Sequence, residues 1–149
     1  MTKLLFICHG NICRSTMAEF VMKDLVEKKE MKDQFYIASA ATSMEEIGNP
    51  VHHGTQRILK EHGISCAGKY AVRLERRDYD QYDLMIGMEQ YNIRNIMKII
   101  GSDPEQKVKL LLDYTNRPGD IADPWYTGNF DLTYKDVLEG CQGLLKSLN

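Results

Sequence analysis

The sequence predicts an α/β fold in which a single domain, residues 1–149, contains a four-stranded parallel sheet with helices on both faces. Short apolar runs alternate with amphipathic helical segments, a pattern typical of parallel sheets with helical crossovers. The chain has 149 residues, enough for one sizeable core, and it contains no internal repeat, low-complexity tract or linker. It also opens with an apolar strand, a tight loop and a helix, in that order.

Each strand is predicted from a short apolar run, and each helix from apolar residues at helical spacing. The predicted strands cover residues 4–7, 35–37, 83–88 and 107–112. The predicted helices cover residues 15–30, 52–62, 90–100 and 133–147. Residues 38–50 are expected to form a loop, since Gly48 and Pro50 break regular structure.

The first predicted strand leads into a loop that begins at Cys8 and ends at the cation Arg14. Ser15 and Thr16 favour a helix N-cap, and the residues after them are periodic and apolar. A loop between a strand and a helix can direct several backbone N–H groups at one point, close to the positive end of the helix dipole. We therefore predict an anion-binding loop with Cys8 at its base.

The residue types in this loop favour phosphoryl transfer to cysteine. A helix N-terminus and a nearby cation favour the nucleophilic thiolate form of Cys8. Arg14 offers a planar fork of donors that matches two phosphate oxygens, and Ser15 can donate its hydroxyl to the sulfur. Gly10 can adopt a positive φ close to a ligand, and Asn11 tolerates left-handed geometry and can tie the loop together. The Cys8–Arg14 spacing alone is a weak signal, but its place between a strand and a helix strengthens the prediction.

A second candidate site lies in the long segment 113–131, which starts at the same sheet edge as Cys8. Within it, Asp123 is followed by Pro124, which stiffens the chain beside the carboxyl group. A neutral carboxylic acid at this place would protonate the leaving oxygen of a phosphate ester and then act as a base on water. The sequence leaves open the alternative that Asp123 is an ordinary turn aspartate.

These two motifs, Cys8–Ser15 and Asp123–Tyr126, resemble the phosphate-binding loop and the acid motif of the low-molecular-weight protein tyrosine phosphatases. The resemblance covers nearly the whole chain and includes further motifs at Ser39–Ser43, Gly48, His62–Ile64, Tyr82–Leu84 and Met88. It implies a phosphatase-I-like sheet of strand order 2-1-3-4. It also implies hydrolysis of phosphotyrosine in proteins, and of aryl phosphates, through a cysteinyl-phosphate intermediate without cofactor or metal.

The resemblance implies a role for each residue of the site. Cys8 would be the nucleophile, Arg14 would bind the phosphoryl oxygens, and Asp123 would be the general acid and base. The other phosphate- and substrate-binding residues would be His9, Gly10, Asn11, Ile12, Cys13, Ser15, Trp125 and Tyr126.

Three of these positions carry a more specific implication. Trp125, the only tryptophan, would form a wall for the substrate ring. Relatives that act on phosphoarginine carry threonine at the position of Ile12, so isoleucine favours phosphotyrosine. Cys13 would be the resolving thiol when Cys8 is oxidised, with a small apolar filler as the alternative.

The chain departs from the family pattern at Asn129, which replaces an acid with little effect on mechanism, and at two places that bear on the site. Glu45, with Glu46 beside it, stands where the loop over the active-site mouth often presents an aromatic residue or histidine. These carboxylates would disfavour acidic sequences next to phosphotyrosine. Lys69–Arg73 replaces a motif whose histidine supports the phosphate loop in many relatives, which leaves the support of Asn11 open.

The composition limits the expected partners. The net charge is −2, so neither nucleic acid nor a membrane is expected as a partner. No signal peptide or membrane span is predicted, and four cysteines without zinc-type spacing favour a cytoplasmic protein with reduced thiols. The expected partners are phosphotyrosine-containing proteins and phosphate or other oxyanions. His52, His53 and His62 are expected on the solvated surface rather than around a metal.

Two alternative functions are considered. A thiol-coupled arsenate reductase shares this fold and loop, but it would need two further cysteines near the third strand, and residues 80–89 contain none. A non-catalytic phosphate-binding module would tolerate the loss of Cys8 or Asp123, and both are present. Cys66 and Cys141 are expected to be inert.

Overall fold

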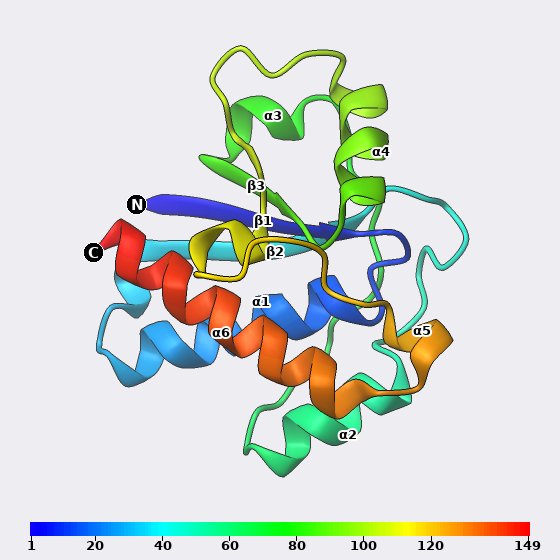
Figure 1. Cartoon of the computed structure of the whole chain (residues 1–149), viewed down its shortest axis with the longest axis vertical. Coiled ribbons are helices and arrows are strands. Elements are labelled where there is room, and N and C mark those ends of the chain that lie inside the picture. Colours follow the sequence, from blue (N-terminus) through cyan, green and yellow to red (C-terminus); the bar gives the residue numbers. More distant parts are fainter.

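The computed structural model describes all residues 1–149 and contains one four-stranded sheet between two layers of helices (Figure 1). The strands are β1 (Thr2–Cys8), β2 (Phe35–Ala41), β3 (Leu84–Gly87) and β4 (Val108–Leu110). The α-helices are α1 (Arg14–Lys28), α2 (His53–Glu61), α3 (Asp78–Gln81), α4 (Gln90–Ile100), α5 (Pro124–Thr127) and α6 (Phe130–Leu148). Two short 3-10 helices are η1 (Lys32–Gln34) and η2 (Leu111–Tyr114).

All strand pairs are parallel, and the strand order is β2-β1-β3-β4, which confirms the predicted fold class. Strand β1 lies inside the sheet, where Leu5 pairs with Ala38 on one side and with Met85 on the other. The end of β1 therefore lies in the middle of the carboxyl edge, between the neighbouring strand ends. Ligands bind at this edge in open parallel sheets.

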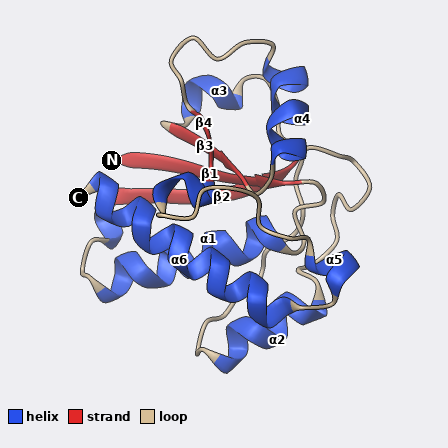
Figure 2. Cartoon of the chain, viewed as in Figure 1, coloured by secondary structure: helices blue, strands red, loops and turns tan.

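Side chains of β1 alternate between two apolar cores, one on each face of the sheet. Leu4 and Phe6 belong to the larger core, which includes residues of α1, α2 and α6. Leu5 and Ile7 belong to the smaller core, which includes residues of α3 and α4. Figure 2 shows these two helical layers on opposite sides of the strands. None of the helices has the length and apolar character that a bilayer span requires.

Two strands end at other residues than the sequence predicts, because contacts with distant or following residues set their ends. Strand β2 continues to Ala41 because each of its residues pairs with β1, so part of the predicted loop 38–50 is a strand. Strand β4 ends at Leu110 instead of residue 112. The chain turns there into η2, and the Asp113 carboxylate accepts a hydrogen bond from Leu110 N.

Helix boundaries also differ. Helix α6 begins at Phe130 rather than residue 133, because the Asn129 side chain accepts a hydrogen bond from Leu132 N and caps it. The first helix begins at Arg14 and ends at Lys28. The four-residue helix α3 was not predicted, since a single turn gives no apolar period to detect.

Candidate active site

Cys8 is the last residue of β1 and pairs with Ala41 at the end of β2. Residues 9–13 then lead into α1, whose first residue is Arg14. The chain beyond β4 returns to the same edge of the sheet, where α5 lies (Figure 1). The fold thus brings the two predicted motifs together, although Arg14 and Asp123 are 109 positions apart in the sequence.

The backbone N–H groups of residues 9–13 donate no hydrogen bond to another protein group. The carbonyl oxygens in this region are used instead: Cys8 O accepts from Thr42 N and His9 O accepts from Ser43 N, both at 3.0 Å. These two hydrogen bonds hold the loop backbone in place, while its N–H groups stay free to bind an anion. Several unpaired N–H groups in one tight turn are the arrangement expected of an oxyanion cradle.

Asn11 adopts the left-handed conformation in this loop, with a φ of 59°. Gly10 does not have a positive φ, so the prediction for Gly10 is wrong. The cause lies in the Asn11 side chain: Oδ1 accepts from Val72 N at 3.1 Å, and Nδ2 donates to Ser15 Oγ at 2.8 Å and to Ser39 Oγ at 2.9 Å. These bonds hold a conformation that non-glycine residues rarely adopt, and they supply the support for Asn11 that the sequence left open.

Ser15 lies beside the cysteine, with its Oγ 3.1 Å from Cys8 Sγ. Ser15 and Thr16 are in the first turn of α1 and neither caps the helix, because both side chains have other partners. Thr16 Oγ1 donates to Cys13 O at 3.0 Å, and Ser15 Oγ accepts from Asn11. The predicted cap is therefore wrong, whereas the predicted contact between Ser15 and the sulfur is present.

Arg14 is only 2% exposed, and its guanidinium is held by three groups. Nη1 donates to the Glu89 carboxylate and, at 2.9 Å, to Ile121 O. Nη2 donates to Asp123 Oδ2 at 3.3 Å. Glu89 was not predicted from the sequence, yet it follows β3 at the carboxyl edge, where the rule that selects Cys8 also applies.

Asp123 occupies the N-cap of α5, where its Oδ1 accepts a hydrogen bond from Trp125 N at 3.0 Å. Its other oxygen faces Arg14, so the carboxyl group is fixed from two sides. The chain just before it is anchored by the hydrogen bond from Ile121 N to Met88 O, at 2.8 Å. The sequence left open whether Asp123 is a turn residue or part of the site. In the structure Asp123 caps α5, and its carboxylate also contacts Arg14.

A cavity of about 120 Å³ opens over these groups. It is lined by Cys8, His9, Gly10, Ile12, Cys13, Arg14, Glu45, Glu46, Asp123, Trp125 and Tyr126. Trp125 is 56% exposed and Tyr126 is 83% exposed, so both rings stand at the opening. The cavity therefore has an anion-binding base and aromatic groups at its mouth.

Two carboxylates lie at this mouth, as predicted for Glu45 and Glu46. His9 Nε2 and Glu45 Oε2 are 2.9 Å apart, which ties the loop after β2 to the phosphate loop. The His9 ring also lies 6.3 Å from the ring of Tyr91. The histidine ring thus belongs to the rim of the cavity.

All four cysteines are free thiols in the structure. Burial, with a smaller contribution from the nearby Cys8 sulfur, raises the pKa of Cys13 to about 12. Burial also raises the pKa of Cys141, which has no exposed surface, and that of the partly buried Cys66. These three thiols are therefore protonated at neutral pH and are poor nucleophiles.

His52 is not a solvated surface residue, which corrects the sequence expectation. Its Nδ1 accepts a hydrogen bond from Gly54 N at 3.0 Å and caps α2, and its backbone N donates to Ile12 O at 2.9 Å. The ring stacks on Phe130 at 5.2 Å and meets Trp125 edge-on at 5.5 Å. Desolvation and the neighbouring His53 lower the pKa of His52. No group of three metal-ligating side chains occurs in the structure.

Comparisons with known proteins agree with this geometry. The model of the family described as low molecular weight phosphotyrosine protein phosphatase matches residues 3–149. The chain belongs to this family. It is 40% identical over 150 residues to the low molecular weight protein-tyrosine-phosphatase YfkJ of Bacillus subtilis, an alignment that covers 99% of this chain and 96% of YfkJ. The PtpA protein of Staphylococcus aureus (strain MRSA252) is 36% identical over 148 residues, covering 97% of this chain and 92% of PtpA.

Solved structures of the family have the same fold. The crystal structure of YfkJ gives a TM-score of 0.95, with 99% of this chain and 94% of that chain covered. The low molecular weight protein tyrosine phosphatase SP-PTP of Streptococcus pyogenes is 41% identical, with a TM-score of 0.90 and coverage of 100% and 94%. The strand order expected from the resemblance is therefore the one that the chain adopts.

Proposed function

We propose that this chain hydrolyses phosphotyrosine in proteins, and aryl phosphates, through a cysteinyl-phosphate intermediate. The observation that carries the proposal is the convergence of Cys8, the unpaired N–H groups of residues 9–13 and the Arg14 guanidinium on one cavity. A thiolate, a set of backbone donors and a planar cation together suit a phosphoryl group and its negative charge. Membership of the phosphatase family supports the same reaction.

In the first step, the Cys8 thiolate attacks phosphorus in line, and the bond between sulfur and phosphorus forms as the bond to the phenol oxygen breaks. The N–H groups of residues 9–13 and the Arg14 guanidinium hold the equatorial oxygens during this transfer. Asp123 donates its proton to the departing phenolate. The Asp123 carboxylate accepts hydrogen bonds from Arg14 and from Trp125 N and lines the same cavity, which supports this role.

In the second step, water attacks the cysteinyl phosphate and gives its proton to Asp123. The bond between sulfur and phosphorus breaks, and the electron pair returns to Cys8 as the thiolate. Ser15 stabilises this leaving thiolate by donating its hydroxyl, since its Oγ is 3.1 Å from the sulfur. Phosphate then leaves, and Asp123 is protonated for the next cycle.

The aromatic mouth supports phosphotyrosine-containing proteins as substrates. Trp125 and Ile12 line the cavity above its anion-binding base, where a flat phenyl ring would extend from the bound phosphoryl group. Glu45 and Glu46 at the rim favour neutral or basic residues beside the phosphotyrosine. The free thiols fit a reducing compartment, and we place the protein in the cytoplasm.

Cys13 completes the proposal as the resolving thiol for an oxidised Cys8, because both residues line one cavity. Cys13 is protonated at neutral pH, so resolution should become faster as the pH rises. Peptide mapping after mild peroxide should find Cys8 linked to Cys13. A linkage of Cys8 to another cysteine, or sulfonic acid alone, would exclude this role.

Turnover of a phosphotyrosine peptide and of p-nitrophenyl phosphate by the reduced protein tests the main proposal. Vanadate should inhibit both reactions, because it forms with the cysteine a trigonal-bipyramidal adduct that resembles the transition state of phosphoryl transfer. EDTA should have no effect on either reaction. If the reduced protein binds phosphate but releases none from either substrate, the binding-module alternative is correct. Thiol-dependent reduction of arsenate would instead support the reductase, although its two additional cysteines are absent from residues 80–89.

A further inference from the structure

The hydrogen bonds that support the phosphate loop continue beyond Asn11 to a buried charged group. Ser39 Oγ accepts from Asn11 Nδ2 at 2.9 Å and donates to Glu19 Oε1 at 2.5 Å. Lys69 Nζ donates to Ser39 O at 2.9 Å and lies 3.6 Å from Glu19 Oε1. The other carboxylate oxygen of Glu19 accepts from Lys23 Nζ at 2.6 Å. The series therefore connects the catalytic cysteine to a carboxylate on α1 and to two lysines.

The chemistry of these groups decides which one donates the proton in each hydrogen bond of the series. The amide nitrogen of Asn11 can only donate, so both serine hydroxyls accept from it and must use their own protons elsewhere. Ser39 gives its proton to Glu19, and the Ser15 hydroxyl, 3.1 Å from Cys8 Sγ, can give its proton to the sulfur when Cys8 is a thiolate.

Glu19 is only 5% exposed, so its negative charge requires buried partners. The side chain of Lys23 is 44% exposed and that of Lys69 is 14% exposed, so solvent screens Lys23 far more. Burial lowers the pKa of Lys69, while Glu19 and, more weakly, Cys8 oppose this effect. The charged groups that act on Lys69 are thus Glu19 and Lys23 on α1 and Cys8 at the end of β1.

We propose that Lys69 is a positioning residue, which holds the Glu19 carboxylate and Ser39 in place and thereby directs the Ser15 hydroxyl at Cys8 Sγ. The proposal rests on the cysteine chemistry proposed above. It assigns a function to a residue at which this chain departs from the family pattern. Lys69 touches neither substrate nor sulfur and acts only through the hydrogen-bond series.

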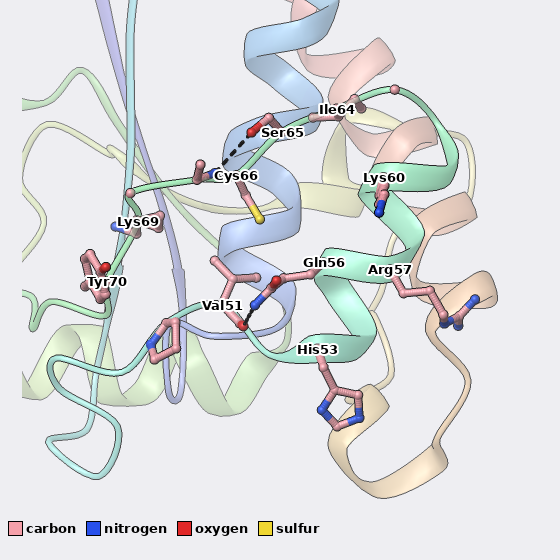
Figure 3. Close-up of a pocket in the computed structure, with 14 residues that line it drawn as sticks. Val51, His53, Gln56, Arg57, Lys60, Ile64, Ser65, Cys66, Lys69 and Tyr70 are labelled. Carbon is pink, nitrogen blue, oxygen red and sulfur yellow. Dashed lines mark hydrogen bonds between the residues drawn. The ribbon is translucent and has the colours of Figure 1, made fainter.

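The other side of Lys69 lines a cavity of about 830 Å³ between α2 and the segment 63–70. Figure 3 shows Lys69 on the segment side of this cavity and Lys60 on the α2 side. No carboxylate lines the cavity. A truncated Lys69 would therefore leave a space that a small amine could enter from solution, and Lys60 offers a matched control with no contact to the series.

The first test compares Lys69→Met with Lys60→Met. Lys69→Met should lower kcat for p-nitrophenyl phosphate about tenfold, the scale of one lost hydrogen bond to a charged group. The rate of Cys8 alkylation by iodoacetate should shift to higher pH in this variant, because the thiolate loses a directed donor. Lys60→Met should match the wild type in both measurements.

The second test uses Lys69→Ala, which keeps the proposal testable if the methionine variant does not fold. Propylammonium should restore part of the lost kcat, and tetramethylammonium, which has no N–H donor, should not. Wild-type kcat and alkylation profiles in both Lys69 variants would overturn the proposal. A loss of kcat with an unchanged alkylation profile and no rescue would show that Lys69 is only structural, and this result would also overturn the proposal. An inactive wild type with normal alkylation would instead overturn the proposed hydrolysis.

Discussion

The two segments that form the site differ in how they are held. In the phosphate loop, residues 8–15, Asn11 alone makes three side-chain hydrogen bonds, and every residue except His9 and Gly10 is buried. In the acid segment, residues 120–127, Pro124 and Ile121 are buried, but the aromatic side chains of Trp125 and Tyr126 are largely exposed. The phosphate loop is fixed by polar contacts with the interior, whereas the acid segment is held mainly by contacts of Ile121 and of the Asp123 carboxylate.

This difference matches the two chemical tasks. A phosphoryl group is small and always the same, so preorganised donors that need no rearrangement stabilise its transition state best. A protein substrate presents varied sequences, which exposed side chains on a loop can contact without disturbing the core. We therefore expect changes in the phosphate loop to affect the chemical step, and changes in the acid segment to affect the leaving group and the substrate.

The largest effect should come from Cys8→Ser, which removes the nucleophile from the phosphate loop. Turnover of any phosphomonoester should be lost, whereas phosphate should still bind, because the N–H groups and Arg14 hold it. Isothermal titration with phosphate and a turnover assay measure the two properties separately. Cys66→Ser, a change to a cysteine outside the site, should retain wild-type turnover. Substantial activity in Cys8→Ser would disprove the covalent mechanism.

The next effect should come from Asp123→Asn, which keeps the shape of the side chain but removes its proton. Turnover of phosphotyrosine should fall by about 100- to 10,000-fold, and turnover of esters with acidic phenols should fall much less. Single-turnover rates across substituted phenyl phosphates would show a steep dependence on leaving-group pKa only in this variant. The control is Asp113→Asn, since Asp113 accepts a hydrogen bond from Leu110 N and does not line the catalytic cavity. Equal slopes in the variant and the wild type would exclude Asp123 as the acid.

A smaller effect is expected from Trp125→Ala, which tests the exposed wall of the cavity. An aromatic contact contributes about 0.5–1.5 kcal/mol, so kcat/KM for phosphotyrosine peptides should fall about two- to tenfold. The melting temperature should fall only slightly, because more than half of the Trp125 surface is exposed in the fold. Tyr36→Ala, at a similarly exposed aromatic residue far from the site, should leave kcat/KM unaltered. An equal loss for a small alkyl phosphate would contradict a role in binding the ring.

A weaker, salt-dependent effect is expected from Glu45→Gln with Glu46→Gln. The wild type should prefer peptides with basic residues beside phosphotyrosine by a few-fold at low ionic strength, and the double variant should lose this preference. Glu61→Gln with Glu105→Gln changes the net charge equally at exposed sites outside the cavity, so it controls for overall charge. Equal kcat/KM for acidic and basic peptides in the wild type would show that the rim carboxylates do not contact the substrate.

The smallest effect concerns His52, which joins the two segments. Its neutral Nδ1 caps α2, and its pKa is lowered in the folded protein from a reference of 6.5. A lowered pKa means that the folded protein disfavours the protonated imidazole. The neutral His52 therefore stabilises the fold above the pKa of the unfolded state, and this contribution is lost as the pH falls through the pKa of the folded state. Urea unfolding at pH 7.5 and 5.5 should show a loss in the wild type that is smaller in His52→Asn. An equal loss in both proteins would exclude His52 as the titrating group, and His62→Asn is the control.

The sequence predicted the sheet, its helical layers and the residues of the anion-binding loop, because these depend on apolar periods and on local residue types. It could not predict the conformation within that loop. Asn11 rather than Gly10 takes the positive φ, since its amide has partners at Ser39 and Val72 that only the tertiary fold supplies. Glu89 and His52 were missed for the same reason, because their partners Arg14 and Trp125 are distant in the sequence.

The unpaired N–H groups of residues 9–13 also link folding to the concentration of oxyanions. An oxyanion that binds these N–H groups stabilises the native state, because only the folded loop brings the donors together. An anion that binds only the folded chain adds about 2.7 kcal/mol to the free energy of unfolding at a hundred times its dissociation constant. Phosphate, the product of the proposed reaction, is therefore expected to protect this protein against heat and proteolysis while it competes with the substrate.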